Sequence, residues 1–520
     1  MKRPFIWLVL ASLLAGACSS GGSSTQKNAK PDSEPSGESA ASPFVPEPPA
    51  GAETIPTEPG SYNYSPAVLD EGNVIKVWWC SAVPDAATDN IWYQEYDKQT
   101  KKATSRRSVL QVGKPGDWDT FGVCHPSVIR GSWPGAPGGG AFTYAMYYTS
   151  TNVAQGGGSN NSTGVVFSTD GINWSGQHDK YNPMIKQKVR DVAGTYGAGL
   201  PAAWSRGGSA VTLFWIDTTA IKTDDPNSPD GYRSQAVFAD SADGKKFGPT
   251  KTVSQNGAPA YWKNDYAFDD SVQPPMVYSA QALNFRQGKG KEDKNETFNF
   301  GLYRVPMDEL LAGGGKWEQL AVVDTNLTGF PLNFEPGLSR TGEGKVAPTV
   351  GKDGLRVWFG GGGQSPFTWG LRSETLKLGV GRLPLRRYSS GSGGAKSYWV
   401  TTGFVPPAYR SGGAKPTTLG LLDSRPADGL VPLYACQRGP LTTTPEGQLT
   451  GVGADRFLSL ESCTGAEPLG TNGYVFATAP SGTRTKPLYA CKDGQAQFLS
   501  NDPKCEGKIV ERLLGYARAE

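Results

Sequence analysis

Ser65-Pro66-Ala67-Val68-Leu69 is the first of five similar stretches, in each of which a proline opens a short apolar run. The others are His125-Pro126-Ser127-Val128-Ile129, Leu200-Pro201-Ala202-Ala203-Trp204, Gln273-Pro274-Pro275-Met276-Val277 and Ala347-Pro348-Thr349-Val350. Successive prolines are 60, 75, 73 and 74 residues apart. Such a period signals repeated supersecondary units and leaves room for four short strands with their loops. The sequence therefore predicts an all-β fold, with a five-bladed β-propeller over residues 61–388.

Glycines and strand-like segments follow the prolines at regular distances. Gly72, Gly207 and Gly354 each lie six residues after a proline, which favours a hairpin turn. Aromatic and β-branched residues fill the segments behind them, at 74–79, 211–216 and 355–359. Residues 168–174 and 241–247 share a Ser-x-Asp-Gly turn followed by an aromatic residue, and we expect these turns to be structural.

The composition limits the class of protein. The 68 glycines and 40 prolines leave little room for long helices, and 520 residues favour more than one domain. A net charge of +3 gives no reason to expect nucleic acid as a partner. With only two histidines, a histidine-rich zinc site is excluded, whereas an oxygen-liganded calcium ion stays open. We expect a monomer with no cofactor.

The N-terminus predicts export. Lys2-Arg3 precedes an apolar stretch at residues 5–14, which is too short to span a membrane stably. Leu14-Ala15-Gly16-Ala17-Cys18 resembles the bacterial lipobox, in which the cysteine is lipidated; an ordinary signal peptide is the alternative. Residues 1–18 are thus expected to be a lipoprotein signal, and residues 19–60 a disordered tether. The chain would be anchored to the cell envelope, at the outer membrane or the cell surface.

The other six cysteines form three local pairs, and an exported chain permits disulfides. From their positions we predict Cys80 with Cys124, Cys436 with Cys463, and Cys491 with Cys505. In the propeller, Cys80 would end the second strand of blade one, and Cys124 would begin the first strand of blade two. A metal site is the alternative, although the close CxxC spacing of zinc sites is missing.

A second domain follows residue 388. Residues 389–425 are predicted to be a linker with a closing segment. In residues 426–520, the order Leu-Tyr-Ala-Cys, Phe-Leu-Ser, Cys and Gly-Tyr occurs twice. This resembles a module of tandem repeats, of unassigned biochemical role, that is often appended to secreted bacterial hydrolases and surface proteins. A small β-rich domain of this kind would gain stability from its two disulfides.

The proline-opened strands, residues 142–148 and residues 168–174 resemble the five-bladed propeller glycosidases of glycoside hydrolase family 43 and its relatives. These enzymes act on fructans or on arabinose and xylose polymers. Their general base is an Asp directly before the blade-one proline, where this chain has Ser65. Arg190-Asp191-Val192 resembles their Arg-Asp-Pro motif, whose Asp stabilises the transition state. Phe334-Glu335-Pro336 is loosely similar to the Glu-Cys-Pro motif that supplies the acid.

The candidate site is the funnel where the first strands begin, because a propeller gathers these residues around one axis. Two carboxylates that flank a bond suffice for glycosidic cleavage. The candidate catalytic residues are Asp191, Glu335, Asp217 and Asp270, and the candidate substrate-binding residues are Tyr64, Ser65, Trp118, His125, Arg190 and Gln273. Each acid has an alternative role as a turn cap or in a surface ion pair.

Three functions follow from these residues. The first is a surface lipoprotein that hydrolyses a polysaccharide or oligosaccharide. The second, favoured by Ser65 in the place of the base, is a propeller that binds carbohydrate or mediates adhesion without catalysis. The third is a propeller that scaffolds other proteins and has no affinity for sugars.

Overall fold

The computed structural model describes residues 62–82, 88–100, 102–151, 161–188, 196–222, 232–258, 264–283, 299–348, 354–363, 369–377, 381–391, 396–410, 415–445, 447–453 and 455–520. Cys18 and the predicted tether, residues 19–60, lie outside these ranges. Within them, the regular elements are mostly strands, and the α-helices α1 (Met307–Leu311), α2 (Thr325–Thr328) and α3 (Pro407–Arg410) are very short. None of the described helices has the length and apolar character needed to cross a bilayer.

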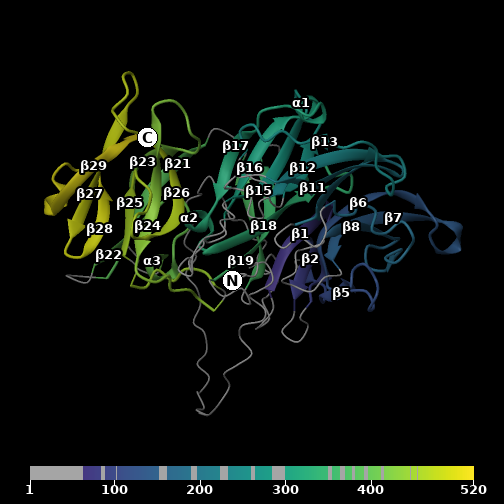
Figure 1. The fold of residues 1–520 in the computed structure, drawn as a ribbon. Helices are drawn as coiled ribbons and strands as arrows, with labels where there is room; N and C mark the ends of the chain where they lie inside the picture. Colours follow the sequence, from purple (N-terminus) through teal and green to yellow (C-terminus); the bar gives the residue numbers. More distant parts are fainter. Residues whose placement is uncertain are drawn as a thin grey trace, which may run out of the picture.

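Five antiparallel blades surround one axis in the described part of the chain, which confirms the predicted propeller (Figure 1). The innermost strands β1, β6, β10, β14 and β18 contact one another in this order, and β18 contacts β1 again. From the axis outward, the strands are β1 (Tyr62–Glu71), β2 (Val74–Ala82), β3 (Asn90–Asp97), β4 (Lys102–Ala103) and β5 (Arg107–Leu110) in blade one; β6 (Gly122–Pro134), β7 (Ala141–Thr151), β8 (Ser162–Ser168) and β9 (Trp174–Ser175) in blade two; β10 (Ala198–Gly207), β11 (Ala210–Lys222), β12 (Tyr232–Ser241) and β13 (Lys251–Thr252) in blade three; β14 (Asn264–Asp269), β15 (Met276–Leu283), β16 (Asn299–Pro306) and β17 (Glu318–Val323) in blade four; and β18 (Leu332–Arg340), β19 (Gly354–Gly362) and β20 (Gly370–Lys377) in blade five.

The ring closes between its first and last blades. Strands β1 and β18 pair in parallel, with Val68 opposite Ser339 and Leu69 opposite Arg340. Blades one and five are therefore one continuous sheet, which removes two exposed strand edges at this joint.

A bulge interrupts the innermost strand of four blades, each time at a residue that precedes a proline. These bulge residues are Ser65, His125, Leu200 and Glu335, with φ angles of 53°, 50°, 56° and 44°. The pairing with the second strand shifts at each of them. Proline has no N–H to donate to a ladder, so it favours a bulge, and a bulge redirects the side chains beside it. The left-handed backbone costs about 1–2 kcal/mol at each non-glycine residue.

Two of the five predicted strand openings are wrong. Pro66, Pro126 and Pro201 lie in innermost strands, but Pro274 lies in the turn between β14 and β15, and Pro348 lies between β18 and β19. The apolar run behind Pro274 is the second strand of its blade. A proline ahead of an apolar run fits either the first strand or the turn before the second, so the pattern alone does not separate them.

The side chain of Arg340, from β18, lies on the axis and is 1% exposed. Its Nη1 donates to the carbonyl oxygens of Ala203 at 3.3 Å and Tyr266 at 3.2 Å. Its Nη2 donates to Ser127 Oγ at 3.2 Å, and Asp265 Oδ1 lies 3.2 Å from Nη1. One guanidinium therefore joins β18 to β6, β10 and β14.

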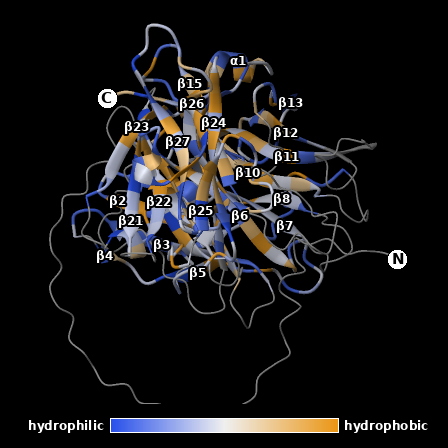
Figure 2. Cartoon of the chain, turned by 90° about the vertical axis from the view of Figure 1, so that its left-hand side faces the viewer, coloured by the Kyte–Doolittle hydropathy of each residue, from blue (hydrophilic) through white to orange (hydrophobic). Residues whose placement is uncertain are grey.

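Large aromatic residues join neighbouring blades through the two Ser-x-Asp-Gly turns. The indole of Trp78, in blade one, donates to the carbonyl oxygen of Gly171 at 2.8 Å. The hydroxyl of Tyr147, in blade two, donates to Gly244 in blade three at 2.9 Å. Both aromatic side chains are 0% exposed. Figure 2 shows hydrophobic residues, in orange, along many of the strands. These turns are structural, as expected.

The C-terminal module, residues 382–518, contains three copies of a three-stranded unit in the described part of the chain. Within each unit the first strand pairs with the other two, and the third strands of all three units pair with one another around a pseudo-threefold axis. The strands are β21 (Arg382–Ser390), β22 (Ser397–Thr401) and β23 (Thr417–Asp423); β24 (Leu430–Arg438), β25 (Asp455–Ser459) and β26 (Glu467–Phe476); and β27 (Thr485–Asp493), β28 (Ala496–Ser500) and β29 (Ile509–Arg518).

All three units carry the same two marker dipeptides. A Pro-Leu in the first strand buries its leucine completely, at Leu385, Leu433 and Leu488. A Leu-Gly in the third strand places its glycine at positive φ, at Gly420, Gly470 and Gly515. These angles favour glycine because other residues would be strained there.

The predicted domain boundary is wrong, because the sequence predicts only the second and third units. The segment 389–425, expected to be a linker and closing segment, belongs to the first unit, and the last propeller strand ends at Lys377. The first unit has Tyr388 where the others have Cys436 and Cys491. The predicted disulfides Cys436–Cys463 and Cys491–Cys505 are present in the second and third units.

The connection between blades four and five packs against the C-terminal module. Asp324 caps α2 by accepting the amide of Leu327, and its other oxygen accepts the amide of Thr471 at 2.9 Å. The side-chain amide of Asn326 donates to the carbonyl oxygen of Thr471 at 3.0 Å, and its oxygen accepts from the Thr401 hydroxyl. Burial raises the pKa of Asp324 to about 7.

We expect the Arg340→Met substitution to lower the free energy of unfolding by about 3–5 kcal/mol, because it leaves the Asp265 carboxylate buried without its partner. Urea denaturation measures the loss. The matched control is Arg304→Met, whose ion pair with Glu318 is partly exposed, so we expect a loss of about 1 kcal/mol or less. Equal losses in the two variants would contradict the axial role of Arg340.

The pKa of Asp324 predicts a dependence of stability on pH. A carboxyl whose folded-state pKa is raised binds its proton more tightly in the folded than in the unfolded protein. Its contribution is complete below about pH 4 and is lost as the pH rises toward about 7. We therefore expect the free energy of unfolding of the wild type, minus that of Asp324→Asn, to decrease over this range. A difference that stays constant or increases, as measured by chemical denaturation, would show that Asp324 is not the group responsible.

Candidate active site at the mouth of the propeller

The mouth of the propeller is the end of the axis at which the innermost strands begin. Two of its bulge residues touch each other, although they are 210 residues apart in sequence. The Nε2 atom of His125 lies 3.2 Å from Oε1 and 3.1 Å from Oε2 of Glu335. Both side chains are buried, with exposed fractions of 7% for His125 and 1% for Glu335. We call these two residues the bulge pair.

The bulge pair joins a carboxylate to an imidazole in a site that excludes most water. Because Nε2 faces Glu335, a proton on that atom is shared with the carboxylate. Within the described residues, Nδ1 of His125 has no hydrogen-bond partner. When Nε2 carries the ring proton, Nδ1 is the hydrogen-bond acceptor of the imidazole.

Tyr196 lies beside the bulge pair, just ahead of β10. Burial and then the negative charge of Glu335 raise the pKa of Tyr196 well above its ordinary value, while a hydrogen bond with Thr149 lowers it. The hydroxyl of Thr149 also accepts the amide of the bulge residue Leu200 at 2.8 Å. Tyr196 therefore stays protonated near neutral pH and can donate a hydrogen bond.

Aromatic rings and a disulfide form one wall of the mouth. The ring of Tyr64 lies 5.8 Å from that of Phe334, which lies 5.1 Å from Trp369. The predicted disulfide Cys80–Cys124 is present beside them and ties β2 to β6. The Tyr64 hydroxyl donates to Asp89 at 3.0 Å. Because Tyr64 is 5% exposed, its ring packs within this wall. The sequence predicts instead that this ring offers a face to a sugar.

Asp217 is the other buried candidate acid among the described residues. It lies on β11 opposite Ala198, the first residue of β10, which places it on the side of the mouth, as predicted. Its carboxylate accepts from Nζ of Lys188. Burial raises the pKa of Asp217, and Lys188 opposes that shift. Ser65, at the bulge of blade one, is fully buried.

Three other predicted site residues lie elsewhere in the fold. Asp270 and Gln273 are exposed in the turn after β14, at the opposite end of the axis, because Pro274 does not open an innermost strand. Asp270 pairs with Lys345 at 2.7 Å, and this lowers the pKa of Asp270. Trp118 packs on Tyr148 with ring centres 5.5 Å apart, and is half-buried.

Arg190 and Asp191 lie outside the described residues, so their predicted roles stay predictions. Tyr196 and Phe334 are not among the residues that the sequence singles out as ligands. The sequence does contain a signal for the position of Glu335. Like Ser65, Glu335 directly precedes a proline, and both residues lie at the bulge of an innermost strand.

A cluster that could hold a metal ion lies away from the bulge pair, in the loops before β6 and after β9. The Nε2 atom of His178 lies 3.1 Å from Asp119 Oδ1 and 3.5 Å from Asp117 Oδ2. Asp119 is 0% exposed, whereas His178 is largely exposed. Mixed carboxylate and imidazole ligands suit several divalent ions.

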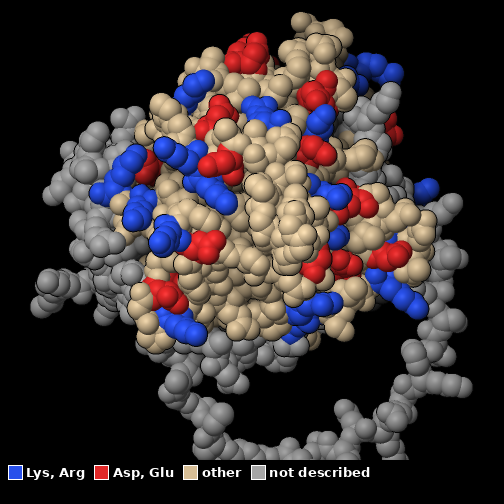
Figure 3. All heavy atoms as spheres, turned by 90° about the vertical axis from the view of Figure 1, so that its right-hand side faces the viewer, with Lys and Arg blue, Asp and Glu red and all other residues tan. Residues whose placement is uncertain are grey.

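Basic and acidic side chains are intermingled on the face of the molecule that Figure 3 shows.

No family model matches this chain, and no curated protein matches it. Among solved structures, it is similar to a thermostable family-43 glycoside hydrolase, with 10% identity, a TM-score of 0.39, and coverage of 69% of this chain and 100% of the other. An α-L-arabinofuranosidase from Podospora anserina has 13% identity and a TM-score of 0.38, over 64% and 94% of the two chains. An endo-arabinase from Bacteroides thetaiotaomicron has 10% identity and a TM-score of 0.37, over 62% and 98%. Likenesses at these identities and TM-scores carry no argument about activity.

Proposed function

We propose that this protein hydrolyses a glycosidic bond of a polysaccharide or oligosaccharide at the mouth of the propeller. The proposal is carried by the bulge pair, a buried carboxylate in contact with a buried histidine at the end of the axis. Strained backbone at both residues supports it, since such strain concentrates at functional sites.

Glycosidic cleavage needs one group that protonates the leaving oxygen and a second that acts on the opposite side of the sugar. Asp217 suits the acid, because burial raises its pKa and favours the protonated form. The bulge pair would activate water in place of the Asp that family 43 enzymes have before the blade-one proline. Tyr196 would donate a hydrogen bond beside Glu335.

A non-catalytic carbohydrate-binding or adhesion propeller is the second candidate. It is favoured by Ser65, which cannot act as an unassisted base near neutral pH, and by the nearly complete burial of Tyr64.

We test catalysis with wild type, Glu335→Gln and Asp217→Asn on arabinan, xylan and fructan, measuring released reducing sugar. We expect each variant to lose at least about 100-fold in kcat/KM, because each lacks a proton-transfer group. Asp270→Asn, an exposed acid at the opposite end of the axis, is the matched control and should keep full activity. Asp191→Asn tests the remaining predicted acid.

Full activity of Glu335→Gln would remove the bulge pair from the mechanism. Binding of a glycan by the wild type without product would favour the second candidate.

We also propose that Cys18 is lipidated and anchors the protein to the cell envelope, on the basis of the lipobox-like residues that precede it. In cells, Cys18→Ser should move the protein from the membrane fraction to the soluble fraction, because acyl chains supply the membrane affinity. Immunoblots of fractionated cells measure this. An unchanged membrane fraction would contradict lipid anchoring at this residue.

A further inference from the structure

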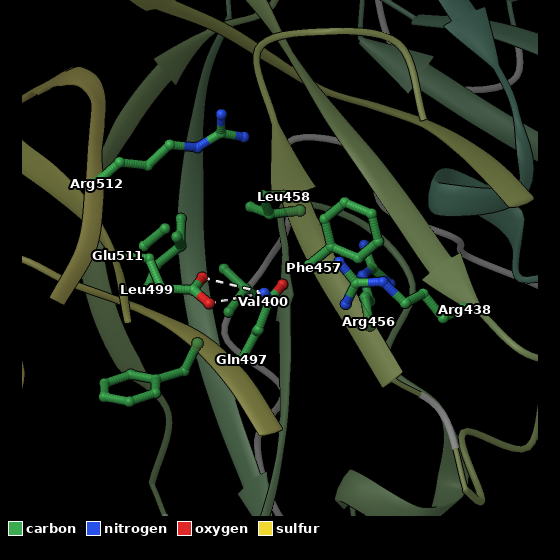
Figure 4. Close-up of a pocket in the computed structure, with 11 residues that line it drawn as sticks. Val400, Arg438, Arg456, Phe457, Leu458, Gln497, Leu499, Glu511 and Arg512 are labelled. Carbon is green, nitrogen blue, oxygen red and sulfur yellow. Dashed lines mark hydrogen bonds between the residues drawn. The ribbon is translucent and has the colours of Figure 1, made fainter. Parts of the chain in front are cut away.

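A cavity of about 240 Å³ opens in the C-terminal module, away from the mouth of the propeller (Figure 4). It lies where the middle strands of the three units, β22, β25 and β28, contact one another. Val400, Leu458 and Leu499, which occupy equivalent positions in these strands, form its apolar floor. The volume is below the range of about 300–1,000 Å³ for drug-sized ligands, so the cavity suits a single small ring.

Positive charge dominates the polar lining. Arg438, Arg456 and Arg512 line the cavity together with one carboxylate, that of Glu511. Arg438 is also paired with Asp455 at 3.0 Å. Figure 4 shows Arg512 and Glu511 on one side of the cavity, and Arg438 and Arg456 on the other. Both carboxylate oxygens of Glu511 accept from the amide of Gln497, at 3.1 and 3.0 Å. The lining therefore attracts an anion and keeps an amide–carboxylate pair that can bond hydroxyl groups.

Arg456 places a buried positive charge beside the cavity. It is 4% exposed, and its guanidinium lies 4.0 Å over the ring of Trp399. Its Nη2 donates to Asn326, whereas Nε and Nη1 have no hydrogen-bond partner among the described residues. Both atoms have almost no accessible surface, so protein atoms enclose them and they are not open to the cavity.

The pKa of Arg456 agrees with the geometry. Burial lowers it to about 9, while Tyr409 and Asp324 act in the opposite direction. The two carboxylate oxygens of Asp324 accept hydrogen bonds from the backbone amides of Leu327 and Thr471. Asp324 forms no hydrogen bond with Nε or Nη1 of Arg456. Among the residues that the structure describes, no carboxylate forms a direct ion pair with Arg456.

The remaining lining identifies the class of anion. Phe457 and Phe498 add aromatic surface to the apolar floor. A ligand that satisfies the lining has a carboxylate for the guanidinium groups, an apolar ring face for the floor, and hydroxyls for Gln497 and Glu511. A sugar ring with a carboxylate combines all three.

We propose that this cavity binds the carboxylate-bearing ring of an acidic saccharide. Only the second unit supplies the buried cation, since the equivalent residues are Tyr398 in the first unit and Gln497 in the third. The module therefore offers one such site within its described residues. This proposal goes beyond hydrolysis at the mouth and does not depend on it.

Isothermal titration calorimetry on the mature full-length protein tests the site with glucuronic acid and galacturonic acid as probes. Glucose, galactose and sodium sulfate are the comparison ligands. We expect binding of at least one of the two acids, and weaker or no binding of glucose, galactose and sulfate. Arg512→Gln should weaken binding by about tenfold or more, because it removes an ionic hydrogen bond. Arg107→Gln, an exposed arginine on blade one, is the matched control and should bind as the wild type does.

Arg456→Gln can disturb the contact with α2, so Arg512→Gln and Gln497→Leu carry the test, since both side chains are more exposed. Equal affinity for neutral and acidic sugars, or unchanged affinity in both variants, would overturn the proposal. Sulfate that binds as tightly as the sugar acids would also overturn it, because the ring would then contribute nothing. Glu335→Gln should leave this binding intact, which separates the outcome from that of the hydrolysis assay.

Discussion

The propeller depends on one buried charge, the guanidinium of Arg340 on its axis. Where the innermost strands converge, two backbone carbonyls and the Ser127 hydroxyl accept from this guanidinium. A planar group with several donors in fixed directions can bond oxygens of several strands at once, which an ammonium on a flexible chain does less well. Asp265 compensates the charge. Arg340 thus ties β18 to three other innermost strands.

The bulges make the mouth chemically useful. A regular strand would alternate its side chains between the two faces of the blade. The residue before each proline departs from that alternation, and in blades two and five this brings His125 and Glu335 together. The same bulge thus recurs in four blades with a different side chain each time. It carries a hydroxyl at Ser65, an imidazole at His125, an aliphatic chain at Leu200 and a carboxylate at Glu335.

The sequence predicts the class of fold, the number of blades and all three disulfides, because proline spacing and cysteine position are local signals. It does not predict Arg340 or Tyr196 as important, because their partners come from distant blades. Blade five shows why two openings are misplaced: Glu335-Pro336 has the right dipeptide, but Pro348, like Pro66 and Pro201, is followed by a glycine six residues later. In the C-terminal module, the first unit keeps Pro-Leu and Leu-Gly while Tyr388 replaces the cysteine, and so the most visible marker is lost.

The contact between α2 and the C-terminal module limits how freely the module could be exchanged. Domains that are joined only by a linker can be exchanged between proteins as cassettes. Here Asp324 and Asn326 satisfy their polar groups on the module, within the turn that joins two blades. A different partner domain would leave Asp324 and Asn326 without these hydrogen bonds, so an exchange of the module would require compensating changes at both positions.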